Sequence, residues 1–102
     1  MTAVFTPRYA AIEQLMSDEQ GPWTDIYGLA VTLYCAIVGK APPTAMERLR
    51  KDTIDYLSRL QPAGFSREVL RGLDAGLAVR AADRPQTVAA WRGLFALAGD
   101  ET

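Results

Sequence analysis

The feature that most constrains the fold is a continuous apolar segment over residues 26–38, IYGLAVTLYCAIV. Thr24 can cap a helix there, and Asp25 lies in its first turn, where a negative charge stabilises the helix N-terminus. Gly39 ends the segment, and a Pro-Pro pair at 42–43 prevents its continuation. The β-branched residues also suit a buried strand, but the length favours a helix. A membrane span needs ~20 apolar residues, so the sequence predicts a central buried helix, about residues 24–38.

Shorter helices are expected around the central one, and no convincing alternating strand pattern is present. Residues 10–16 can form a short helix, and apolar residues between 46 and 60 recur at helical spacing with a break at 52–53. Ser66 and Thr87 are N-cap candidates for two further helices. In the helix that begins after Ser66, Gly72 and Gly76 each lower helix stability by up to ~1 kcal/mol relative to alanine. Their presence suggests close packing against a neighbouring helix. The predicted fold class is all-α, with five or six helices around the central buried helix.

Composition excludes several classes of function. The 102-residue chain has a net charge of -1, so no nucleic-acid partner is expected. Its basic cluster of Arg48, Arg50 and Lys51 is interpreted as a solvated helix face. One cysteine, Cys35, and no histidine exclude a disulfide within the chain, the usual zinc sites and Ser-His-Asp catalysis. No signal peptide or membrane segment is visible, so a cytoplasmic location is expected.

Few charged residues are candidates for chemistry. Glu13, Asp25, Asp83 and Arg84 each lie beside an apolar segment or a capping signal. A charge next to a buried helix costs several kcal/mol unless it is paired, so Asp25 needs hydrogen-bond donors. A helix-capping carboxylate is the simpler alternative, and composition does not show whether Glu13 pairs with Arg84. The eight glycines form no phosphate-binding loop, so no cofactor or metal is expected in this chain.

Four motifs follow one another along the chain. Residues 6–14 read TPRYAAIEQ, residues 21–30 GPWTDIYGLA, residues 33–43 LYCAIVGKAPP and residues 77–87 LAVRAADRPQT. In order and spacing they resemble T-P-x-Y-A-A-P-E-Q, D-I-Y-x-L-G, L-Y…T-G-x-x-P-P and L-A-x-x-P-x-D-R-P-Q-S of bacterial eukaryotic-like (Hanks-type) serine/threonine protein kinases. The resemblance covers almost the whole chain, from the end of the activation segment to the last helix of the C-terminal lobe. It implies that residues 1–102 are a partial kinase domain without the N-lobe and the catalytic loop.

The resemblance also implies roles for single residues. The substrate-side loop would consist of Thr6, Pro7, Arg8 and Tyr9. Its threonine would contact the catalytic aspartate and lysine of the catalytic loop, and the other three residues would line the pocket for the substrate residue after the phosphoacceptor.

Three further residues would act as scaffold. Glu13 would pair with Arg84 as a buried bridge between the activation segment and the last helices. Asp25 would anchor the central helix by accepting backbone N–H groups of the catalytic loop, and Trp23 would pack the preceding loop onto the core. The chain departs from the family pattern at Phe5, Ile12, Ala30 and Arg80-Ala81, and none of these positions touches a reacting group.

No residue here matches the phosphate-binding lysine, the catalytic aspartate or the metal-binding aspartate of a kinase. The resemblance therefore implies no catalytic residue in this chain, and ATP and magnesium only in the longer kinase it would belong to (the parent kinase). The chain would be inactive alone, with the missing kinase parts and the protein substrates of the parent as its partners. Any membrane anchor of the parent would lie outside this sequence.

Two alternatives stay open. The chain could be a pseudokinase-like or stand-alone helical module for protein interaction, or an unrelated helical bundle with chance matches. The bare apolar face expected on the central helix also predicts self-association, because large exposed apolar patches promote it.

Overall fold

The computed structural model describes residues 9–16 and 18–99, and this part of the chain contains six α-helices. In chain order they are α1 (Ile12–Leu15), α2 (Pro22–Val38), α3 (Ala45–Arg50), α4 (Leu57–Leu60), α5 (Arg67–Gly76) and α6 (Val88–Gly99). A short 3-10 helix, η2 (Ala81–Asp83), precedes α6. None of the described residues is in a strand. The prediction of an all-α fold with five or six helices is confirmed.

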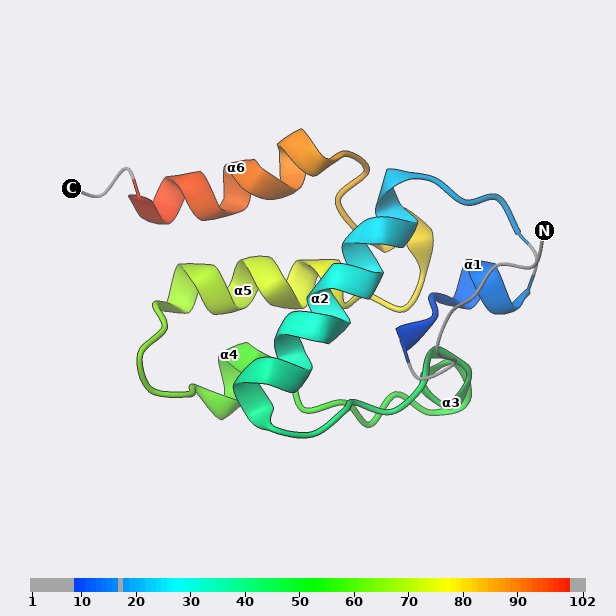
Figure 1. Cartoon of the computed structure of the whole chain (residues 1–102), viewed down its shortest axis with the longest axis horizontal. Helices are drawn as coiled ribbons and strands as arrows, with labels where there is room; N and C mark the ends of the chain where they lie inside the picture. Colours follow the sequence, from blue (N-terminus) through cyan, green and yellow to red (C-terminus); the bar gives the residue numbers. More distant parts are fainter. Residues whose placement is uncertain (1–8, 17, 100–102) are drawn as a thin grey trace.

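Three helices build the centre of the molecule. Figure 1 shows α5 and α6 running side by side in opposite directions, with α2 crossing α5. Helix α2 also contacts α6, while α4 lies against α5 and α1 lies near α3. The core forms where α2, α5 and α6 meet, and its fully or nearly fully buried side chains include Ile26, Tyr27, Val31, Leu70, Leu73 and Trp91. Burying a large apolar side chain contributes about 1.5–3 kcal/mol, so this crossing is the main apolar contribution to stability.

The central helix α2 begins two residues earlier than the expected cap at Thr24. Pro22 occupies its first position, where the fixed φ of proline suits a helix and its missing N–H is not needed. The N-cap is Gly21, whose backbone N–H donates to Thr24 Oγ1 at 3.2 Å. At the other end Gly39 adopts a left-handed conformation with φ 89° and donates its N–H to the Cys35 carbonyl at 2.8 Å. The predicted end is confirmed, and the capping role of Thr24 is corrected.

The caps of the later helices follow the prediction. Ser66 Oγ accepts a hydrogen bond from the Val69 N–H at 3.2 Å, and Thr87 Oγ1 accepts one from the Ala90 N–H at 3.0 Å. The break expected at 52–53 is an irregular segment, residues 51–56, between α3 and α4. The first helix is shorter than the expected 10–16, since α1 spans only Ile12–Leu15.

Gly76 lies where α5 crosses α2. A Cβ atom at this position would lie 3.0 Å from Ala30 Cβ and 3.1 Å from both Ile26 and Trp91. Gly72, one turn earlier, faces the Phe95 ring, and its carbonyl accepts a hydrogen bond from Trp91 Nε1 at 2.8 Å. Both glycines therefore permit the close helix packing that their positions in the sequence suggest.

Across residues 9–16 and 18–99, no helix combines the length and the hydropathy that a membrane-spanning segment needs.

We predict that Gly76→Leu destabilises the fold by about 1–3 kcal/mol, because the added side chain has to displace α2 or Trp91. The matched control is Gly93→Ala in α6, where nothing lies within 4 Å of an added Cβ. That change should stabilise the fold by up to ~1 kcal/mol through helix propensity. Urea melts of the two variants measure both effects, and equal stability of the two would contradict the close approach at Gly76.

Candidate functional site

A buried ion pair joins the two ends of the described chain. Arg84 donates from Nη1 to Glu13 Oε2 at 2.8 Å and from Nη2 to Glu13 Oε1 at 2.7 Å. The two residues are 71 positions apart, and each is only 3% exposed. This parallel pair of bonds is the strongest geometry available to a carboxylate and a guanidinium. The structure thus brings together the two residues for which the kinase resemblance implies a bridge.

The remaining donors of Arg84 are also paired. Nε donates to the Ala78 carbonyl at 2.8 Å, Nη1 also donates to the Trp23 carbonyl at 2.7 Å, and Nη2 also donates to the Val79 carbonyl at 3.1 Å. A guanidinium has five N–H donors, so each of them has an acceptor. The group also lies 5.0 Å from the centre of the Tyr27 ring, a favourable position for a cation.

Local structure around η2 holds Arg84 in place. The Arg84 N–H donates to the Ala81 carbonyl at 3.1 Å, which closes the turn. Gln86 Nε2 donates to the Ala81 and Arg84 carbonyls, at 2.9 and 2.8 Å. Within the sequence ADRPQ, arginine is therefore the buried member and glutamine closes the loop, while Asp83 stays exposed.

The environment of Glu13 favours its charged form. Burial alone raises the pKa of Glu13, but hydrogen bonds from Arg84 and Thr24 outweigh it, so the pKa lies below its ordinary value. Thr24 Oγ1 donates to Glu13 Oε2 at 2.7 Å while accepting the cap bond from Gly21. The hydroxyl thus connects the beginning of α2 to the ion pair.

Tyr9 and Asp25 line one surface hollow of about 380 Å³ at the beginning of α2. Tyr9 is 37% exposed, and Asp25 is exposed in the first turn of the helix. Among the described residues, no side chain or backbone group bonds to the Asp25 carboxylate. The carboxylate is solvated here, and its role as an anchor for a catalytic loop stays a prediction. The predicted substrate-side residues Thr6, Pro7 and Arg8 lie outside the described residues.

Trp23 lies half-buried next to the ion pair. Its ring covers Gly21, where an added Cβ would approach ring carbons to 2.7 Å. Its Nε1–H is buried and has no acceptor among the described residues. Trp23 lies in the first turn of α2 and not in the loop before it, and its contact with Gly21 and its carbonyl bond to Arg84 join the beginning of the helix to the ion pair.

The basic cluster on α3 is not a solvated face, because Arg48 is only 2% exposed. Its Nε and Nη2 donate to the Asp52 carboxylate at 2.9 and 3.1 Å, and Nη2 also donates to Tyr56 Oη at 3.0 Å. Nη1 donates to Tyr27 Oη at 3.4 Å and to the Leu77 carbonyl. The solvated-face interpretation was wrong for Arg48, although Arg50 and Lys51 are exposed.

Sequence reasoning also missed Asp74. From α5, its Oδ1 and Oδ2 accept hydrogen bonds from the Leu57 and Ser58 N–H groups at 2.8 and 3.0 Å. The carboxylate thus caps α4, which has no side-chain cap of its own at Tyr56. Asp74 lies 17 and 16 positions from Leu57 and Ser58, so no sequence spacing indicates these contacts. The one available signal was an acidic residue between Leu73 and Leu77 of the apolar stripe.

Within the described residues, no group of three His, Cys, Asp or Glu side chains could hold a metal ion.

Together, the helices and the buried glutamate–arginine pair fit the last part of the C-terminal lobe of a serine/threonine protein kinase. Serine/threonine-protein kinase PknK of Mycobacterium tuberculosis, in two strains, is 28% identical over 90 residues, which are 82% of this chain and 8% of PknK. The solved structure of PpkA-294 in its apo form matches with a TM-score of 0.81 and 44% identity, covering 87% of this chain and 31% of that one.

The resemblance to a bacterial serine/threonine kinase C-terminal lobe is thereby confirmed in both sequence and structure. No protein-family model matches the chain. The chain spans less than a tenth of the length of the curated relatives and about a third of PpkA-294.

We predict that Glu13→Ala and Arg84→Ala each destabilise the fold by ~3–5 kcal/mol, because either change leaves a buried charge without its partner. That is a large share of the roughly 5–15 kcal/mol typical of a domain. Thermal and urea melts measure the loss, and Asp18→Ala, at an exposed carboxylate, serves as the control. The double variant should lose less than the sum of the two single changes. Neutral single variants would show that the pair does not hold the fold.

The lowered pKa of Glu13 also predicts a pH dependence. A depressed pKa contributes stability that is complete above the pKa of the unfolded chain and is lost as pH falls through the folded-state pKa. Wild-type stability should therefore fall more steeply than that of Glu13→Gln on acidification from pH 7 to pH 3, in melts at constant ionic strength. Asp52, whose pKa Arg48 also lowers, contributes equally to both proteins. Parallel profiles would contradict the assignment to Glu13.

Proposed function

We propose that this chain forms the substrate-side loop and the helical base of a serine/threonine protein kinase that phosphorylates Ser and Thr residues of proteins. The observation that carries the proposal is the match to PpkA-294, 44% identical with a TM-score of 0.81 over 87% of the chain. The buried Glu13–Arg84 pair supports it, because the bridge lies where the kinase motifs imply it. We propose that residues 1–102 form a partial protein kinase domain, as the resemblance implies.

Phosphoryl transfer itself would depend on other parts of the parent kinase. The printed sequence has no histidine, no glycine-rich phosphate loop and no counterpart of the metal-binding aspartate. ATP and magnesium would bind to those other parts, and the chain alone would transfer no phosphate. A cytoplasmic location, where ATP is available, follows from this proposal.

One exposed face of α2 could be covered by other parts of the parent kinase. Asp25, Leu29 and Leu33 follow one another at four-residue spacing and so share a helix face. Leu29 is 50% and Leu33 is 36% exposed. The face joins the hollow beside Tyr9 to an apolar hollow of about 720 Å³ between α2, α5 and α6. We infer that the catalytic loop covers the end at Asp25 and that an apolar helix covers the end at Leu33.

The same bare face keeps the second candidate function open. A pseudokinase-like or stand-alone module could use the apolar hollow, lined by Leu33, Leu73 and Phe95 among others, to hold another protein. Self-association of the isolated chain through this face stays a prediction. Activity measured in a complete kinase separates the two functions.

The test is a chimera in which this chain replaces the matched segment of PpkA-294. We predict that the chimera folds and keeps a measurable fraction of the ATP-dependent phosphorylation of unmodified PpkA-294, because the two chains match with a TM-score of 0.81 and 44% identity. Asp25→Ala in the chimera should lower the rate at least ~10-fold, the scale expected when a positioning contact is lost. Radiolabelled phosphate transfer to a protein substrate measures both.

Asp18→Ala is the matched control, since it also removes an exposed carboxylate but lies outside the hollow beside Tyr9. A folded chimera without activity would contradict the kinase proposal and favour the interaction module. Loss of activity in both aspartate variants would show that the effect is not specific to Asp25.

A further inference from the structure

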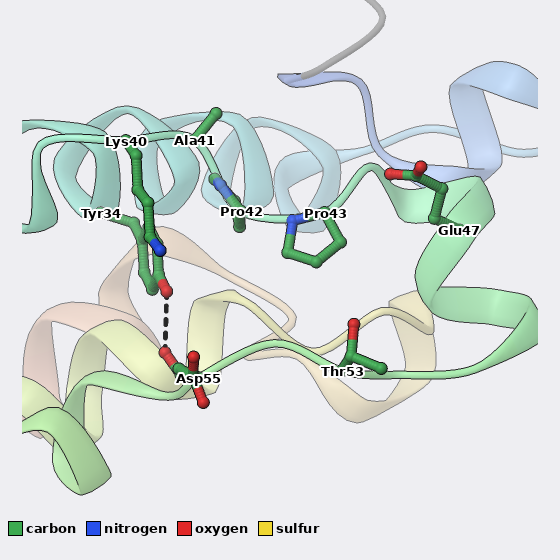
Figure 2. A pocket seen from close by; sticks show the side chains of 8 residues that line it. All are labelled: Tyr34, Lys40, Ala41, Pro42, Pro43, Glu47, Thr53 and Asp55. Atoms are coloured by element: carbon green, nitrogen blue, oxygen red, sulfur yellow. Dashed lines mark hydrogen bonds between the residues drawn. The ribbon is translucent and has the colours of Figure 1, made fainter.

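A further cleft lies beside the C-terminal end of α2 and is lined in part by the motif of residues 33–43. Figure 2 shows the loop carrying Lys40 and Pro42 on one side of this cleft and the segment carrying Thr53 and Asp55 on the other. The volume of the cleft is about 450 Å³. None of the residues that line it belongs to the hollow beside Tyr9 or to the apolar hollow.

The two sides of the cleft are backbone segments that, among the described residues, do not pair with each other. Residues 41–44 and 51–56 are neither helix nor turn, and the dihedral angles of Lys51 and Tyr56 are extended. Two successive prolines, Pro42 and Pro43, lack the N–H that pairing with the opposite segment would need. In the described part of the chain no backbone hydrogen bond joins the two segments, and the N–H groups of Thr53 and Asp55 have no acceptor.

Tyr34 holds the cleft in shape. Its side chain is almost fully buried against α2's neighbours, and its hydroxyl donates to the Asp55 carbonyl at 2.8 Å (Figure 2). In an extended chain the N–H and C=O of one residue point to the same side. Since the Asp55 carbonyl points to Tyr34, we expect the Asp55 N–H to face the cleft as well. The site is therefore formed before any ligand arrives.

The charges of the cleft favour a basic ligand. Asp55 is exposed, and no ion pair or hydrogen bond engages its carboxylate within the described residues. Glu47, whose carboxylate accepts a hydrogen bond from the Thr44 N–H at 2.9 Å, also lines the cleft. Lys40 is the single cation among the residues that line the cleft. The unpaired Asp55 carboxylate is therefore the charge in the cleft with which a basic side chain can pair.

We propose that this cleft binds an extended polypeptide segment that carries an arginine or lysine. The segment pairs its backbone with the free N–H groups of residues 53 and 55, as in strand addition to an exposed edge. Its basic side chain meets the Asp55 carboxylate, and its neighbouring side chains lie on the partly exposed Ala41 and Pro43. The cleft is separate from the site assigned to kinase function, so the proposal holds whether or not the parent is an active kinase.

The experiment is a titration of the ¹⁵N-labelled chain with three capped heptapeptides. The first is Thr-Val-Thr-Arg-Thr-Val-Thr, the second has glutamate in place of arginine, and the third carries N-methyl groups on alternate backbone amides of the first. We expect saturable shifts of the amide signals of Ala41, Thr53 and Asp55, with slowed hydrogen exchange at the last two. The arginine peptide should bind about fivefold more tightly than the glutamate peptide, the scale of one exposed ion pair. The N-methylated peptide should not bind.

Charge reversal separates recognition from a structural effect. Asp55→Lys should invert the preference so that the glutamate peptide binds more tightly, while Asp18→Lys, at an exposed carboxylate outside the cleft, should leave the preference unchanged. Thermal melts check that both variants stay folded. The proposal is overturned if no saturable shifts arise at millimolar peptide, if the shifts lie at Leu29 and Leu33 instead, or if Asp55→Lys does not change the preference.

Discussion

The guanidinium of Arg84 is the group on which the described fold depends. A buried cation costs several kcal/mol unless it is paired and hydrogen-bonded. The acceptors come from three places: the Glu13 carboxylate on α1, the Trp23 carbonyl in the first turn of α2, and the Ala78 and Val79 carbonyls that follow α5. No one of these segments can satisfy the group alone. Placing Arg84 in the interior therefore fixes α1, the beginning of α2 and the end of α5 relative to one another.

Tyr27 links this network to a second one. Its ring lies under Arg84, and its hydroxyl accepts a hydrogen bond from Arg48, which also holds Asp52 and Tyr56. Both buried arginines thus contact one fully buried side chain of α2. The apolar core explains why α2 is central, but the two arginines determine which segments surround its first half and in what order. Polar satisfaction, more than apolar area, specifies this part of the fold.

The helix ends could be predicted from the sequence where contacts between nearby residues determine them. Ser66, Thr87 and Gly39 end or begin helices because each meets backbone groups within four residues, and such contacts can be read from the sequence. The buried contacts of Arg48 and Asp74 could not be predicted in this way. Arg48 has two nearby partners, Asp52 and Tyr56, but its other partners are 21 and 29 positions away. The partners of Asp74 are 16 and 17 positions away. A charged residue in a mixed-charge stretch is usually solvated, and only the tertiary fold shows the exception. The contact of Glu13 with Arg84 was expected solely from the family resemblance, since nothing in spacing or composition indicates it.

The two faces of α2 differ in the burial and pairing of their side chains. On one face, Tyr27, Ala30 and Val31 are fully buried, and the buried charges around them are all paired within the described residues. On the other face, Asp25 has no partner among the described residues and Leu29 is half exposed, so that face presents a polar end and an apolar end to anything that covers it. The covering segment does not have to supply partners for Glu13, Arg84 or Arg48. The arrangement of the described helices is therefore set by the chain's own residues, and what binds to the bare face adds to a scaffold that is already formed.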